Sequence, residues 1–72
     1  MNAMERLSRE IERVTELRRL YEDLRRLPHY SPLTEIPIAG MAASIARAHQ
    51  AAGSGDTLEV LAAISDLAEW AE

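Results

Sequence analysis

Four arginines in a repeated segment are the residues of this chain best suited to binding chemistry. The segment reads Leu17-Arg18-Arg19-Leu20 and then, one heptad later, Leu24-Arg25-Arg26-Leu27. Guanidinium groups hold carboxylates and phosphates through paired hydrogen bonds, so crowded arginines could bind an anion. At the end of the repeat, His29 and Tyr30 add an imidazole and a phenol. The candidate anion or ligand contacts are therefore Arg18, Arg25, Arg26, His29 and Tyr30.

The same arginines are also typical of the solvated side of a helix. On a helix the two arginines of each pair fall in different rows, and acids lie three or four residues away, as Glu22 does from Arg18 and Arg25. Such pairs contribute a few tenths of a kcal/mol each. We favour this solvated interpretation and keep binding of a nucleotide-like anion at chain interfaces as the alternative. An RNA- or DNA-associated bundle comes third, because no nucleic-acid motif or interleaved aromatic residues accompany the arginines.

No pattern in the chain predicts catalysis, a metal or a cofactor. His29 and His49 are the only imidazoles, there is no cysteine, and the two histidines lack the close spacing of a zinc site. The serines have no evident base or orienting group, and no glycine-rich phosphate loop is present. We therefore expect a protein that is not an enzyme.

Size and charge favour a small module that associates with other chains. A chain of 72 residues is near the limit at which one core suffices, and oligomerisation is a common remedy. Its net charge is −4; seven of the eight basic residues lie in the first 27 positions beside six acids, whereas the remainder holds one arginine and six acids. No apolar run approaches the roughly 18 residues of a membrane span, so we expect a cytoplasmic protein that does not enter a membrane.

The spacing of apolar residues predicts a single all-α domain with a long first helix and a helical hairpin. The first 27 residues contain no Gly or Pro and have apolar residues at helical spacing, whereas Pro28, Pro32 and Pro37 favour an extended connector. Gly53-Ser54-Gly55 predicts a turn, and Asp56 with Glu59 resembles a capping box. The expected elements are a helix over about 2–27, a connector over 28–36, and helices over about 37–52 and 57–71.

Small residues predict close packing inside this hairpin. We expect the second helix to offer a small-residue surface made of Ala39, Gly40, Ala43, Ser44 and Ala46. We expect the third helix to pack on it with Leu58, Val60, Leu61, Ile64, Leu67 and Trp70.

The apolar stripe of the first helix changes direction midway, which predicts two separate partners for that helix. Heptad drift accounts for only about 20° per heptad, much less than the rotation of roughly 120° between the two halves. We expect the C-terminal half, from Leu17 to Leu27, to cover the chain's own hairpin. We expect the N-terminal half to pair with another copy in a homo-oligomeric, coiled-coil-like bundle, through an interface made of Met4, Leu7, Ile11 and Val14.

The hairpin sequence AGMAASIARAHQAAGSGDTLEVLAAISDLAEW, residues 39–70, resembles that of small helical proteins of phages and prophages. The matching points are Ala39-Gly40, Ile45, Ala48, Gly55-Asp56, Leu61 and Asp66-Leu67. The resemblance implies an accessory or inhibitor protein that acts by stoichiometric binding to a host protein. The candidate partner-facing residues on the acidic third helix are Glu59, Asp66, Glu69 and Trp70.

Overall fold

Helix α1 spans Ala3–Asp23 in the computed structural model, which describes residues 2–70. Asn2 caps its first turn, because the Asn2 side-chain oxygen accepts a hydrogen bond of 2.8 Å from the backbone N–H of Glu5. The helix then tightens into the 3-10 helix η1, Leu24–Arg26. Leu27 is extended, as expected for a residue that precedes a proline.

Helix α2 spans Glu35–Ser54 and follows the 3-10 helix η2, Pro32–Thr34. The Ser31 hydroxyl caps η2 by accepting a hydrogen bond from the backbone N–H of Leu33. Because η2 already starts the helical winding, α2 begins two residues before the start predicted at Pro37. It ends at Gly55, whose φ of 72° lies in the left-handed region that favours glycine.

Helix α3 spans Thr57–Ala68 and begins with the predicted cap. The Asp56 carboxylate accepts a hydrogen bond of 2.9 Å from the backbone N–H of Leu58. In a complete capping box, the Glu59 side chain would accept a hydrogen bond from the backbone N–H of Asp56. Here that N–H donates instead to the hydroxyl of Ser54, at 3.0 Å. The helix ends at Ala68, before the predicted end near residue 71, which itself lies outside the described residues.

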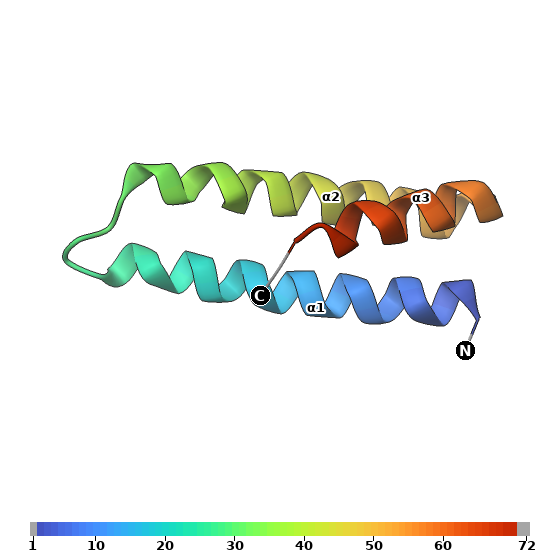
Figure 1. Ribbon diagram of the computed structural model, residues 1–72, viewed down its shortest axis with the longest axis horizontal. Coiled ribbons are helices and arrows are strands. Elements are labelled where there is room, and N and C mark those ends of the chain that lie inside the picture. The colour runs from blue at the N-terminus through green and yellow to red at the C-terminus, as the bar shows by residue number, and fades with distance from the viewer. Residues whose placement is uncertain (1, 71–72) are drawn as a thin grey trace.

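The three helices run up, down and up, and each packs against the other two (Figure 1). Helices α1 and α3 therefore point in the same direction, and α3 begins beside the N-terminus of α1. At about 1.5 Å per residue, α1 is about 32 Å long and α3 about 18 Å long. Helix α3 therefore covers only the N-terminal half of α1, whereas α2 runs along most of it (Figure 1).

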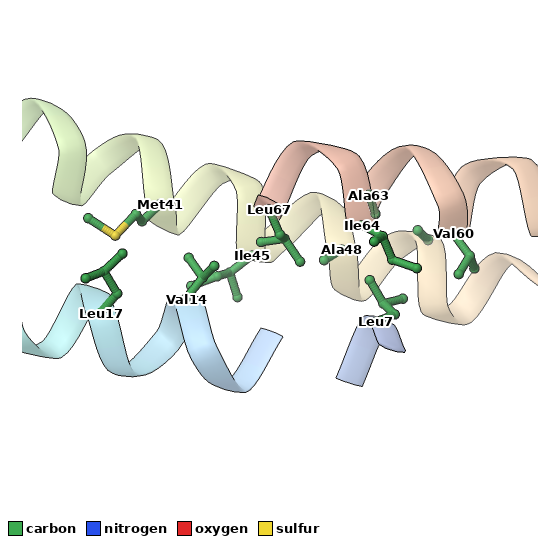
Figure 2. Close-up of a cluster of buried hydrophobic side chains, with 11 residues drawn as sticks. Leu7, Val14, Leu17, Met41, Ile45, Ala48, Val60, Ala63, Ile64 and Leu67 are labelled. Carbon is green, nitrogen blue, oxygen red and sulfur yellow. The ribbon is translucent and has the colours of Figure 1, made fainter. Parts of the chain in front are cut away.

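All three helices contribute to one hydrophobic core (Figure 2). In Figure 2, Leu7 of α1 points at Val60 and Ile64 of α3, while Leu17 faces Met41 of α2. The buried residues of this cluster are Leu7, Val14, Leu17, Met41, Ile45, Ala48, Ala51, Val60, Ala63, Ile64 and Leu67.

The position of α3 contradicts the interface predicted for the N-terminal half of α1. Leu7 is 1% and Val14 0% exposed within the chain's own core, and Ile11 packs partly buried against that core. Only Met4 of the predicted set is exposed. The prediction was wrong because α3 folds back onto this half of α1 and fills the place assigned to a second copy.

The small-residue surface of α2 is also shifted from the predicted one. Ala39, Ala43 and Ala46 are exposed, and the buried small residues of α2 are Ser44, Ala48 and Ala51. On α3, Leu58 and Leu61 are exposed instead of packing on α2, and Ala63 is buried.

Candidate partner-binding face

The predicted anion contacts do not form one site. The Arg25 guanidinium donates two hydrogen bonds, of 2.8 and 2.6 Å, to the two carboxylate oxygens of Glu35, and the Tyr30 hydroxyl donates to the same carboxylate. Arg18 instead pairs with Glu22 at 2.9 Å. Arg26 and His29 are exposed. Arg25 and Tyr30 thus converge as predicted, but on a carboxylate of the same chain.

Charge and hydrogen bonding shift the ionisation of this cluster. Hydrogen bonds from Arg25 and then Tyr30 lower the pKa of Glu35, and the bond to Glu35 raises the pKa of Arg25. Desolvation, followed by the hydrogen bond to Glu35, raises the pKa of Tyr30. The cluster therefore ties the end of η1 to the first turn of α2 across the proline-containing connector.

A hydrogen-bonded network joins α2 to α3 at the C-terminal end of α3. The Trp70 indole N–H donates to the hydroxyl of Ser44 at 3.0 Å, and this hydroxyl donates to the Asp66 carboxylate at 3.3 Å. Arg47 donates to the same carboxylate at 2.9 and 3.2 Å, and also to Ser44. Because Ser44 is only 2% exposed, its hydroxyl needs these partners.

The indole of Trp70 lies on the backbone of α2 at Gly40. A Cβ atom at Gly40 would lie 2.7 Å from the indole Cη2 of Trp70, so only glycine leaves room for the ring. Trp70 is partly buried and packs against the core. Of the predicted partner-facing residues, Trp70 therefore serves mainly as packing, and Asp66 is held by Arg47.

Arg13 fixes the end of α3 from the side of α1. Its guanidinium donates hydrogen bonds to the backbone carbonyl oxygens of Leu67, at 3.0 Å, and Trp70, at 2.7 Å. Glu10 holds the guanidinium in place at 2.7 Å. A cation here satisfies carbonyl groups that a helix C-terminus leaves without partners. The sequence pattern does not predict this contact, since Arg13 resembles its neighbours on the helix.

Two adjoining hollows lie along the surface between α2 and α3, and both are lined by Arg47 and Asp66. Their volumes are about 350 and 310 Å³. The first hollow is completed by Gln50, Ala51, Glu59, Ala62 and Ala63. The second is completed by Gly40, Ala43, Ser44, Glu69 and Trp70. We call this surface the α2–α3 face. Half of the residues that line it have small side chains, which favours the close approach of another backbone.

The α2–α3 face has an excess of negative charge. Arg47 and Asp66 neutralise each other at its centre, whereas Glu59 and Glu69 are exposed and form no ion pair within residues 2–70. Of the four residues predicted to face a partner, these two glutamates remain open to solvent. The lone Arg47 in an otherwise acidic half of the chain is a signal in the sequence that could have indicated this network.

Residues 2–70 contain no cluster of three or more His, Cys, Asp or Glu side chains suited to a metal ion. Over the same residues, none of the helices combines the length and apolar character needed to cross a membrane. No family model, curated protein or solved structure matches this chain.

Proposed function

We propose that this protein is a stoichiometric binding module whose α2–α3 face holds a basic segment of another protein. The observation that carries the proposal is the pair of hollows, half of whose lining residues have small side chains, bordered by the unpaired carboxylates of Glu59 and Glu69. Charge complementarity of this kind favours a basic partner and rejects acidic ones.

The spacing of the two glutamates suggests the form of the partner. Glu59 and Glu69 are separated by ten residues, which corresponds to about 15 Å along a helix. A partner helix with two basic residues about ten positions apart would place one of them beside each carboxylate. Small side chains between these basic residues would fit against the shallow floor formed by Ala51, Ala62 and Ala63.

The resemblance of residues 39–70 to small phage and prophage proteins suggests that the partner is a host protein and that binding inhibits or modifies its activity. Sequestration of a nucleotide-like anion has less support, because Arg25 would have to release Glu35 before it could bind a phosphate. No arrangement of the described residues specifically favours nucleic acid.

The test uses an alanine-rich helical peptide with two arginines ten positions apart. Trp70 is the only tryptophan and lines the second hollow, so its emission should change as the peptide is added. The doubly substituted variant Glu59→Lys/Glu69→Lys should lose the response. As a matched control, Glu5→Lys/Glu12→Lys makes the same double charge reversal at two exposed positions on α1 and should retain the response.

Two further arms separate the alternatives. A peptide with glutamates in place of the arginines should give no response, and equal binding of both peptides would contradict the proposal. Adding a nucleoside triphosphate should leave the thermal midpoint unchanged. A rise in the midpoint that Arg25→Ala abolishes would instead support the anion-binding alternative.

A further inference from the structure

The half of the molecule that α3 does not reach presents an unpartnered apolar surface. Arg13 contacts the last turn of α3, and Leu17 and Leu20 of α1 and Leu24, the first residue of η1, lie 4, 7 and 11 residues further along the chain. This spacing places all four on one side of the helix. These leucines therefore continue the side of α1 that faces α3, beyond the point where α3 ends (Figure 1).

Helix α2 contributes apolar residues to the same opening. Gly40 lies under Trp70, and Ile36 is one turn earlier on the same side of α2, with Leu33 just before it in η2. A hollow beside the end of α3 is lined by Arg13, Glu16, Leu17 and Leu20. Four of the eight exposed large hydrophobic residues in the described chain belong to this opening, with exposures between 41 and 71%: Leu20, Leu24, Leu33 and Ile36. We call these four residues the open groove.

A row of alternating charges borders the open groove on α1. Its members are Glu16, Arg19, Asp23 and Arg26, spaced three or four residues apart and all exposed. When two such rows run antiparallel, Glu16 faces Arg26 and Arg19 faces Asp23, so every pair has opposite signs. When the rows run parallel in register, each residue faces its own kind. Among residues 2–70 these four side chains form only one ion pair, a long 3.6 Å contact between Arg19 and Glu16, which leaves them free to exchange partners.

We infer that a second copy of this chain occupies the open groove, antiparallel to the first, about a two-fold axis near Tyr21. The two uncovered helix pairs then form a four-helix bundle at the centre of the dimer, with an α3 helix on each outer half. The same residues serve both copies, as a two-fold interface requires. This contact lies at the opposite end of the molecule from the turn between α2 and α3 (Figure 1), and it adjoins the α2–α3 face only at the end of α3, beside Gly40 and Trp70.

The contact area expected between the two copies agrees with a weak, reversible dimer. The uncovered part of α1 is about 20 Å long, and the molecule is 19 Å wide. Taken as a flat surface on each of the two copies, this area amounts to a total buried surface on the order of 800 Å². The smaller stable complexes bury about 1,200 Å² in total. The helices need not refold to make this contact.

Light scattering tests the dimer directly. Wild-type protein at about 100 micromolar should have a mass near twice the 8.0 kDa of one chain. Leu20→Asp and Leu24→Asp change exposed side chains and should reduce the mass to one chain without loss of helicity. Leu58→Asp is the matched control, because Leu58 is exposed on α3 away from the open groove, and the dimer should persist. A wild-type mass of one chain at this concentration, or loss of the dimer with Leu58→Asp alone, would overturn the inference.

A charge swap tests the antiparallel register. Arg26→Glu places two glutamates opposite each other at two symmetric positions, and should raise the dissociation constant about fivefold or more. Combining it with Glu16→Arg recreates both pairs with reversed signs and should restore the wild-type value. Failure of the double variant to bind more tightly than Arg26→Glu alone would exclude this register.

Disulfide trapping tests the antiparallel orientation of the two copies through the distances between introduced cysteines. The chain has no cysteine, so a single introduced one reports on one position. Leu20→Cys lies beside the two-fold axis and should cross-link between copies under mild oxidation. Leu27→Cys should not, because its counterpart would lie about 18 Å away along the helix. Cross-linking of Leu27→Cys in preference to Leu20→Cys would contradict an antiparallel pair.

Discussion

The guanidinium of Arg13, on the first helix, lies 2.7 Å from the carbonyl oxygen of Trp70, 57 residues later in the chain. The same side chain reaches the carbonyl oxygen of Leu67, and Glu10 holds it in position. This contact joins the end of α3, the shortest of the three α-helices, to the middle of α1, the longest. It also supports the Trp70 indole, which closes one end of the α2–α3 face.

Removing the Arg13 guanidinium should destabilise the protein through the end of α3. Arg13→Met keeps the aliphatic packing and removes both hydrogen bonds, so we expect the free energy of unfolding to fall by about 1–2 kcal/mol in urea titrations. Arg9→Met, at an exposed position one turn earlier, should change it by less than about 0.5 kcal/mol. Equal effects of the two substitutions would show that the hydrogen bonds from Arg13 to the end of α3 do not contribute to the free energy of unfolding.

Leu7→Ala should test the assignment of the N-terminal half of α1 to the chain's own core. Leu7 is 1% exposed between α1 and α3, so its truncation leaves a cavity and should cost about 2–4 kcal/mol. Met4→Ala, at a position 44% exposed, should cost less than about 1 kcal/mol. The loss with Leu7→Ala should be the same at low and high protein concentration. A concentration-dependent loss would instead place Leu7 at an interface between copies.

Two glycines of α2 should respond to alanine in opposite ways. Gly53→Ala meets no atom within 4 Å and should stabilise the helix by up to about 1 kcal/mol. Gly40→Ala brings a methyl group within 2.7 Å of the Trp70 ring, so the indole must move and its hydrogen bond to Ser44 should be lost. A red shift of tryptophan emission in Gly40→Ala, absent in Gly53→Ala, checks this.

Acid should weaken the junction between η1 and α2 through Glu35. Because the pKa of Glu35 is lowered in the folded protein, its carboxylate contributes stability above the ordinary glutamate value of 4.5, and this contribution is lost as the pH falls through the lower folded value. Wild type should therefore have a higher thermal midpoint than Glu35→Gln at pH 7, and the difference should shrink progressively as the pH is lowered below 4.5. The exposed Glu12→Gln should show no such convergence.

Local patterns predicted the helices well because their causes are local. The absence of Gly and Pro over residues 2–27, the prolines after it and the turn at Gly55 act on the backbone within a few residues. The Asp56 cap was predicted for the same reason. The periodicity of apolar residues does not show which helix covers which. For this reason the interface between copies that was predicted from Met4, Leu7, Ile11 and Val14 was wrong.

Helix lengths in the sequence held the information that would have corrected that interface. Because α2 is about as long as α1 and runs back along it, the turn at Gly55 must lie near the N-terminus of α1. A third helix that starts there can only cover Leu7 and Val14, and it leaves Leu20 and Leu24 open.

The candidate site was less predictable because its key contacts join distant positions. The acids Glu59 and Glu69 could be expected at the surface from their places on α3. In contrast, Arg25 could find several acids by sequence spacing, and its partner Glu35 is reached only after the connector has turned. Arg13 pairs with Glu10 in its own helix, but its contacts with the carbonyl oxygens of Leu67 and Trp70 depend on where α3 ends.

The parallel course of the first and third helices has a consequence for biosynthesis. Leu7 and Val14 are made before α2, whereas the residues of α3 that cover them, from Val60 to Leu67, are made only after α2 is complete. Until then the N-terminal half of α1 has only α2 to shield it. Translation that stops before Val60 would release a helical fragment with exposed apolar residues, which would be prone to aggregate and would be a target for chaperones and proteases.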